Sequence, residues 1–273
     1  MTINCKGRLL DLSTPKVMGV LNVTPDSFYD GGKYSQVDHA MERVRKMILE
    51  GADVIDVGGM SSRPGAEIIC YKEEADRVVP TIEAIAKLDR HIIISIDTVH
   101  SSVAEAAISA GASMINDISG GGIDPSITDV AIRHHVPYIL MHMQGTPETM
   151  QDDPTYQNVV LDILSDLKHK VHYLRSQGLI DLIVDPGFGF GKTLEQNYTL
   201  LRKLSIFKIL NTPLLAGLSR KSMIYKLLDN TPAEALNGTT AAHMVALMNG
   251  ASILRVHDVK EAVECMKIYN AMI

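Results

Sequence analysis

The sequence predicts an α/β protein, a single (β/α)₈ TIM barrel with a short N-terminal hairpin. Eight short apolar runs rich in β-branched residues recur along the chain, and helix-like stretches separate them. The 273 residues match the roughly 250 residues of one such barrel. We therefore expect residues 1–273 to form one domain. A hydrophobic share of 46% is enough for a large core and excludes a disordered chain.

Each apolar run has the length of a buried strand. The hydrophobicity is continuous rather than alternating, as parallel strands covered on both faces require. The runs are Val17–Val23, Val54–Gly58, Ile92–Asp97, Met114–Ile118, Tyr138–Met143, Leu182–Asp185, Leu214–Ser219 and Ile253–His257. A doubly wound parallel sheet is the alternative arrangement for strands and helices that alternate in this way.

The stretches between the runs have helical periodicity. In Ser35–Glu50 the apolar residues fall on one stripe, and Gly51 stands where a helix C-terminus favours positive φ. Ser101–Ala110 ends in the same way at Gly111, and a last helix is predicted over Val259–Met272. Each run is thus followed by a helix, which is the order that a (β/α)₈ barrel needs.

Three segments fall outside this repeat. Thr2–Lys16 precedes the first run and is expected to form a small hairpin that covers the barrel floor. Thr24–Tyr34 and Gly59–Tyr71 are long, rich in Gly, Pro and Ser, and without periodicity. Because both follow strands, they lie on the face of a barrel that carries chemistry, and they are candidate lids.

Composition disfavours several classes of protein. A net charge of −6 argues against a broad nucleic-acid surface, and no apolar stretch reaches the roughly 18 residues of a membrane span. No signal-peptide run follows Met1–Lys6, which predicts a cytoplasmic protein. Cys5, Cys70 and Cys265 are too few and too scattered for a disulfide framework or a CxxC metal site.

Common nucleotide and metal motifs do not match the sequence. Gly187–Thr193 (GFGFGKT) resembles a Walker A loop, but only three residues separate the two glycines where that loop has four. The sequence has no GxGxxG, HExxH or Cys/His ligand spacing, which disfavours a dinucleotide site and a protein-caged zinc. Mg²⁺ shared between a diphosphate and one or two oxygen ligands remains open.

Nearly every apolar run ends in a polar group. Helix N-caps account for some Asp, Asn and Ser at such places, but not for Arg, Lys and His. Because burying an unpaired charge is costly, these groups must meet one another or a ligand at the barrel mouth. They are Asn22, Asp97, Asn116, Asp117, His142, Gln144, Asp185, Ser219, Arg220, Lys221, Arg255 and His257.

The cationic members of this set suit an anion. Arg255 and His257 are two residues apart in a predicted strand, so both side chains point to the same face. Together with Arg63 in the second candidate lid they suit an anion of phosphate type.

The acceptors suit a heterocycle. Asp97, Asn116 and Asp185 follow three different strands and match the donor edge of an amino-substituted nitrogen ring. Lys221 lies between the two sets and could balance Asp185, whereas Asp117 is interpreted as a cap.

Eight motifs closely resemble those of the dihydropteroate synthase family, in order over almost the whole chain. They are MGVLNVTPDSFYDGG, DVGGMSSRPGA, SIDT, INDISGG, LMHMQGTP, DPGFGFGK, GLSRKSMI and RVHDV. The resemblance implies a homodimeric barrel that condenses 6-hydroxymethyl-7,8-dihydropterin diphosphate with 4-aminobenzoate in folate synthesis. It also implies Mg²⁺ as cofactor and sulfonamides as inhibitors.

The resemblance also implies roles for individual residues. The pterin diphosphate would bind to Ser62, Asp97, Asn116, Met141, Asp185, Phe190, Lys221, Arg255 and His257. The 4-aminobenzoate would bind to Phe28, Ser62, Arg63, Pro64, Lys221 and Ser222. The catalytic residues would be Asn22, Asp30, Arg255 and His257, with Asn22 as the Mg²⁺ ligand and Asp30 as an acceptor for the amine proton. Met60, Ser62 and Tyr29 depart from the family pattern, which usually has Glu, Thr and a small Ser at these positions.

Three other functions are compatible with parts of the pattern. A pterin-binding methyltransferase barrel needs no binding site for a diphosphate. A sugar-phosphate barrel enzyme needs no Asp97–Asn116–Asp185 cluster. A pterin carrier without chemistry would not need Asn22, Arg255 and His257.

Overall fold

Eight parallel strands form one closed ring in the computed structural model, which describes residues 1–24, 33–61, 65–150 and 154–273. The strands are β3 (Lys16–Asn22), β4 (Val54–Gly58), β5 (Ile93–Asp97), β6 (Met114–Asp117), β7 (Tyr138–Met141), β8 (Leu182–Asp185), β9 (Leu215–Ala216) and β10 (Ile253–Val256). Their order in the sheet is β8-β7-β6-β5-β4-β3-β10-β9, and a parallel bridge between Val184 and Leu214 closes the ring. The barrel prediction is confirmed, and the doubly wound alternative is wrong.

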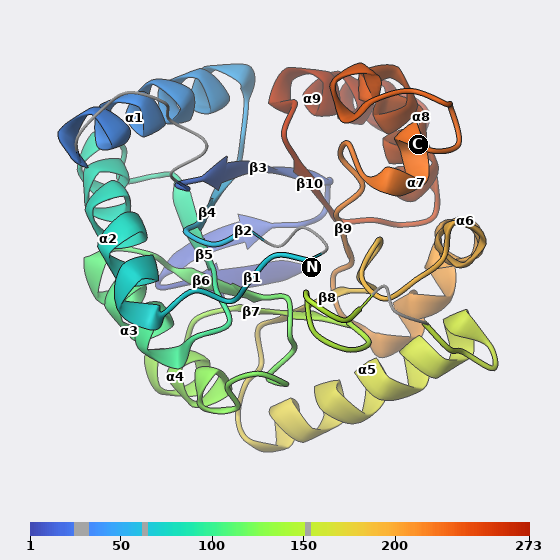
Figure 1. The fold of residues 1–273 in the computed structure, drawn as a ribbon, viewed down its shortest axis with the longest axis horizontal. Coiled ribbons are helices and arrows are strands. Elements are labelled where there is room, and N and C mark those ends of the chain that lie inside the picture. Colours follow the sequence, from blue (N-terminus) through green and yellow to red (C-terminus); the bar gives the residue numbers. More distant parts are fainter. Residues whose placement is uncertain (25–32, 62–64, 151–153) are drawn as a thin grey trace.

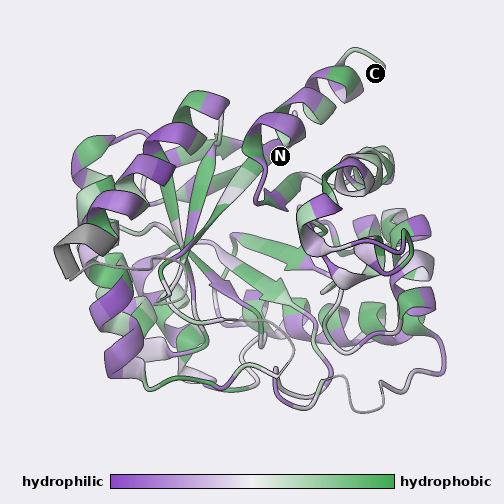
Figure 2. Cartoon of the chain, turned by 45° about the horizontal axis from the view of Figure 1, so that its top comes forward, coloured by the Kyte–Doolittle hydropathy of each residue, from purple (hydrophilic) through white to green (hydrophobic). Residues whose placement is uncertain are grey.

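Helices surround the ring of strands (Figure 1). They are α1 (Lys33–Glu50), α2 (Tyr71–Leu88), α3 (Ser101–Ala110), α4 (Ser126–His134), α5 (Val159–Ser176), α6 (Leu194–Arg202), α7 (Ser222–Tyr225), α8 (Leu236–Met248) and α9 (Val259–Asn270), with 3₁₀ turns η2 (Leu204–Leu210) and η3 (Pro232–Glu234). Gly51 and Gly111 have φ of 100° and 125° at the ends of α1 and α3, as predicted. The strands consist mainly of apolar residues, and the helices contain both apolar and polar residues (Figure 2).

Several strands end earlier than the apolar runs predict. The largest difference is at Leu214–Ser219, where β9 keeps only two residues. The chain turns there, because the Lys221 N–H donates to the carbonyl of Leu218 and the Ser219 hydroxyl accepts from the His257 N–H. Ile118 is only 4% exposed although it lies beyond β6. Apolar residues therefore continue beyond the strands into buried loops, and there an apolar run does not indicate a β-strand.

The N-terminal hairpin closes one end of the barrel, as predicted. Strands β1 (Thr2–Cys5) and β2 (Arg8–Asp11) pair antiparallel and lie across the centre of the ring (Figure 1). Their buried side chains pack on an apolar layer to which each barrel strand contributes one residue. The layer consists of Met18, Val54, Ile93, Met114, Ile139, Ile183, Leu215 and Ile253.

No helix in the described part of the chain combines the length and the apolar composition that a bilayer crossing requires.

Candidate active site

The candidate site begins one step above the apolar floor. Side chains two residues apart in a strand point to the same face, so the residues two positions after the floor layer face the barrel interior as well. They are Val20, Asp56, Ser95, Asn116, Met141, Asp185, Gly217 and Arg255. The interior thus changes from an apolar to a largely polar layer as the strands approach their carboxyl ends.

Arg255 is the centre of this polar layer. Its Nε donates to Oδ2 of Asp56 at 2.6 Å, and its second terminal nitrogen donates to Oδ2 of Asp97. Oδ2 of Asp56 also accepts from Nδ2 of Asn116 at 3.0 Å. One guanidinium therefore bridges two carboxylates. The cationic and acceptor groups that the sequence analysis treats separately belong to one network.

Asp56 is a site residue that the sequence analysis missed. Its side chain is fully buried, and it occupies the middle of an apolar run instead of the end. The available signal is its position in β4: Asp56 is two residues from Val54 and two from Gly58, so all three face the barrel interior. The amide nitrogen of Asn116 bonds to Asp56, so this hydrogen bond orients the amide, whose oxygen is an acceptor.

Burial shifts the pKa values of two carboxyl groups in and beside this network. Burial, together with the nearby Asp56 carboxylate, raises the pKa of Asp97 to about 7, although the Arg255 guanidinium opposes this shift. Burial also raises the pKa of Asp185, again against the effect of a cation, here Lys221. Perturbed titratable groups gathered at the carboxyl ends of barrel strands are typical of an active site.

Lys221, Phe190 and Asp185 converge beside this network. The Lys221 Nζ lies 4.5 Å from the centroid of the Phe190 ring and donates to the carbonyl of Phe188. A Cβ at Gly217 would lie 3.7 Å from both the Lys221 Nζ and Oδ2 of Asp185. Burial lowers the pKa of Lys221 to about 8. A cation and an aromatic face therefore lie together, and the backbone of Gly217 lies beside this cation and the Asp185 carboxylate.

His257 and Ser222 lie at the ends of the last two barrel units. The Nδ1 of His257 is 3.1 Å from the Ser219 hydroxyl, and burial lowers the pKa of His257 to about 4. The ring is therefore neutral near pH 7 and acts as a hydrogen-bonding group. Ser222 is the first residue of α7, which has only four residues. Asp117 accepts from the Tyr138 hydroxyl at 2.6 Å and from the backbone of its own loop, so it is a structural group.

Asn22 ends β3 with an exposed side chain. A Cβ at Gly58 would lie 3.7 Å from Oδ1 of Asn22 and 3.6 Å from Oδ2 of Asp97, so these two oxygens flank Gly58. The described residues contain no cluster of three or more His, Cys, Asp or Glu that could hold a metal ion. One amide oxygen fits Mg²⁺, which keeps several waters and binds chiefly through substrate phosphates.

Some predicted site residues lie outside the described residues. They are Phe28, Asp30, Ser62, Arg63 and Pro64, together with Tyr29.

Met60 lies within the described part of the second candidate lid. It is 9% exposed and belongs to an apolar cluster that also contains Met141 and Phe190. The position where the family usually has Glu is therefore apolar in this chain and packs toward two predicted pterin contacts.

The chain is similar to known proteins along nearly its full length. The family described as "Pterin binding enzyme" matches residues 18–257. Dihydropteroate synthase from Escherichia coli (strain K12) is 45% identical over 273 residues, which is 99% of this chain and 96% of that protein.

Solved structures give the same result. The dihydropteroate synthase of Yersinia pestis, in a sulfonamide drug complex, has a TM-score of 0.94 and 44% identity, and the match covers 100% of this chain and 99% of that one. The enzyme from Xanthomonas albilineans, in complex with 7,8-dihydropteroate, has a TM-score of 0.89 and 37% identity, with 100% and 98% covered. The resemblance found in the motifs is confirmed, and the chain belongs to the dihydropteroate synthase family of pterin-binding enzymes.

Proposed function

We propose that this chain condenses 6-hydroxymethyl-7,8-dihydropterin diphosphate with 4-aminobenzoate, giving 7,8-dihydropteroate and diphosphate. The observation that carries the proposal is the network of Arg255 with Asp56, Asp97 and Asn116 at the carboxyl ends of the strands. It supplies acceptors for the pterin and a cation for the diphosphate. The family to which the chain belongs adds the reaction.

The pterin would lie above the polar layer. Asp97, Asn116 and Asp185 offer oxygen acceptors from three strands to the amino and N–H edge of the ring. The apolar walls would be Met141 and Phe190, which are 2% and 8% exposed. Together with Lys221, these groups make a narrow site suited to a flat polar heterocycle.

The diphosphate would lie at Arg255 and His257, beside the exposed amide of Asn22. Bound Mg²⁺, held by Asn22 and the substrate oxygens, would neutralise charge on the leaving diphosphate. His257 would contribute a hydrogen bond, because burial keeps its ring neutral near pH 7 by lowering its pKa to about 4. The charge on the protein side would come from Arg255.

The reaction would proceed by departure of the diphosphate. The bond between the pterin methylene carbon and the diphosphate oxygen breaks, and the oxygen keeps the electron pair. The resulting methylene cation is stabilised by the electron-rich ring and by the negative field of Asp97 and Asp185. The amine nitrogen of 4-aminobenzoate then bonds to this carbon and releases a proton, for which Asp30 is the proposed acceptor.

The 4-aminobenzoate would bind between the pterin and the two loops. Ser222 and Lys221 would hold its carboxylate at the start of α7, and the loop residues Phe28, Ser62, Arg63 and Pro64 would cover it. Sulfonamides also carry an arylamine, so we expect them to compete for this site.

The direct test of the proposed function is product formation. Purified protein mixed with Mg²⁺, the pterin diphosphate and 4-aminobenzoate is expected to form dihydropteroate, and chelation of Mg²⁺ is expected to suppress the reaction. Product should be measured by chromatography against a reaction without 4-aminobenzoate. No product above that background would contradict the proposal.

The charge of Lys221 predicts a pH dependence. Because burial lowers the pKa of Lys221 to about 8, its ammonium loses its proton as the pH rises through that value. The kcat/KM for the pterin diphosphate should therefore fall above pH 8. Lys221→Gln, which has no charge to lose, should be less active at pH 7 and lack this decline. A profile shared by both proteins would contradict the role of the ammonium.

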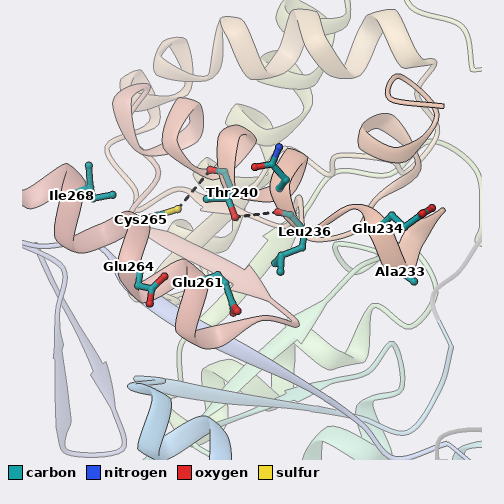
Figure 3. Close-up of a pocket in the computed structure, with 9 residues that line it drawn as sticks. Ala233, Glu234, Leu236, Thr240, Glu261, Glu264, Cys265 and Ile268 are labelled. Atoms are coloured by element: carbon teal, nitrogen blue, oxygen red, sulfur yellow. Dashed lines mark hydrogen bonds between the residues drawn. The ribbon is translucent and has the colours of Figure 1, made fainter. Parts of the chain in front are cut away.

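We also propose that the chain forms a homodimer through its last helices. Val245, Met248 and Ile268 are 42%, 57% and 57% exposed on α8 and α9. A groove between α8 and α9 adds to that surface (Figure 3). It is lined by Ala233, Glu234, Leu236, Asn237, Thr240, Glu261, Glu264, Cys265 and Ile268. Analytical ultracentrifugation should give twice the chain mass, and Met248→Glu should weaken the association. A monomeric wild type at the concentrations of the assay would exclude the dimer.

A further inference from the structure

Lys192 is a buried amine that the proposed reaction does not use, and burial lowers its pKa to about 7. Its side chain is 3% exposed, and it comes from the GFGFGKT segment that the sequence analysis set aside as an imperfect Walker A loop. Its Nζ donates to the carbonyls of Gly187 and Phe190, both at 2.8 Å. It also lies 3.3 Å from Nδ1 and 3.5 Å from the carbonyl of His142.

These contacts define the environment of the ammonium. Burial lowers the pKa of His142 to about 3, so its ring is neutral and Nδ1 can accept a hydrogen bond. The backbone and His142 therefore enclose the Nζ with acceptors from the loop after β8 and from the end of β7. A phosphate has no place among oxygen acceptors, which is why this lysine does not act as a Walker lysine.

The contacts of Lys192 organise the loop between β8 and α6. Gly187 has φ of 74°, and a Cβ there would lie 1.9 Å from the His142 carbonyl oxygen, so this backbone fits closely against the residue that follows β7. On the other side, Oδ1 of Asn197 accepts from the Gly189 N–H at 2.7 Å. Contacts therefore hold the loop from two sides. Asn197 bonds to it on one side, and Lys192 bonds to its carbonyls on the other.

The same loop carries two contacts of the candidate pterin site. The Phe190 ring faces the Lys221 ammonium at 4.5 Å, and the Phe188 carbonyl accepts from that ammonium. Lys192 holds the carbonyl of Phe190 itself. A displacement of this loop would therefore move an apolar wall of the site and a partner of Lys221 together.

We propose that Lys192 is a positioning residue for pterin binding, whose Nζ donates to the carbonyls of Gly187 and Phe190 so that Phe190 and Lys221 keep their places. The proposal rests on the proposed function, because it takes Phe190 and Lys221 as pterin contacts. Lys192 does not touch the substrate, since backbone oxygens enclose its Nζ.

The test compares Lys192→Met with the wild type. Methionine keeps most of the length of the side chain but donates no hydrogen bond. Loss of these hydrogen bonds should raise the KM for the pterin diphosphate and the Kd for 6-hydroxymethylpterin by about tenfold. Phe190 is proposed to contact only the pterin, whereas Lys221 is proposed to contact both substrates and shares the 4-aminobenzoate carboxylate with Ser222. The KM for 4-aminobenzoate should therefore rise by less, by about threefold at most.

A matched control separates positioning from stability. Val171 is 4% exposed on α5 and belongs to the outer core. Val171→Ala should lower the melting temperature without changing either KM. If Lys192→Met lowers only the melting temperature, or raises both KM values equally, the proposal is wrong.

Two further results keep the test decisive. If Lys192→Met does not fold, Lys192→Gln, which retains a neutral donor, is measured against the same criteria and should give a smaller but equally selective rise. A wild type that makes no dihydropteroate contradicts the proposed function. A wild type that makes it, with no selective effect at Lys192, contradicts this inference alone.

Discussion

Arg255→Met is expected to reduce both stability and turnover more than any other single change in the site. The guanidinium bridges Asp56 and Asp97, and its removal leaves two carboxylates close together, one of them fully buried. Breaking a buried pair in this way costs about 3–5 kcal/mol. Because the diphosphate also loses its proposed cation, the kcat/KM should fall by at least about 100-fold. Chemical denaturation and steady-state kinetics would measure the two effects.

Two variants check the cause of that loss. Arg133→Met removes an ion pair with Glu105 in which Arg133 is 59% exposed, and it should cost about 0–1 kcal/mol. Asp56→Asn combined with Arg255→Met removes one of the two unpaired carboxylates and should recover part of the stability but not the activity. An Arg255→Met protein as stable as Arg133→Met would show that the network does not support the barrel.

Among changes that act on pterin binding rather than on stability, Asp185→Ala is expected to have the largest effect. The carboxylate is 5% exposed, and its Oδ1 accepts from the Gly187 N–H at 2.8 Å. Its removal takes away a proposed acceptor for the pterin and the anion near Lys221. By analogy with buried pairs at interfaces, the loss should be about 2–5 kcal/mol of binding free energy. Calorimetry with 6-hydroxymethylpterin measures it directly.

The control for this variant is a carboxylate at the opposite end of the barrel. Asp53 precedes β4 and pairs with Lys16 at 3.5 Å. Asp53→Asn should therefore leave pterin affinity unchanged. Equal affinity of Asp185→Ala and the wild type would show that Asp185 does not contact the pterin.

Much of this architecture could be predicted from the sequence because the relevant signals are local. Continuous apolar runs mark the buried strands, and Gly51 and Gly111 mark helix ends whose positive φ the structure confirms. Polar residues at the strand ends indicate the barrel mouth without any knowledge of tertiary contacts. The hairpin of Thr2–Cys5 and Arg8–Asp11 lies within the Thr2–Lys16 segment before the first run, where a hairpin is predicted.

The remaining features depend on contacts between distant segments. Asp56 lies within an apolar run, and only the approach of Arg255 from β10 gives it a role. Lys192 resembles a phosphate-binding lysine in sequence, and only the folded loop turns carbonyl oxygens toward it. The short β9 likewise reflects a turn held by His257, which no local pattern encodes.

The proposed site places a flat pterin ring between two charged side chains. A crystal structure with 6-hydroxymethylpterin tests it most directly. Electron density for the ring is expected between the Asp185 carboxylate and the Lys221 ammonium, with the donor edge of the ring toward Asp97 and Asn116. Density for the ring anywhere else on the protein would contradict this placement.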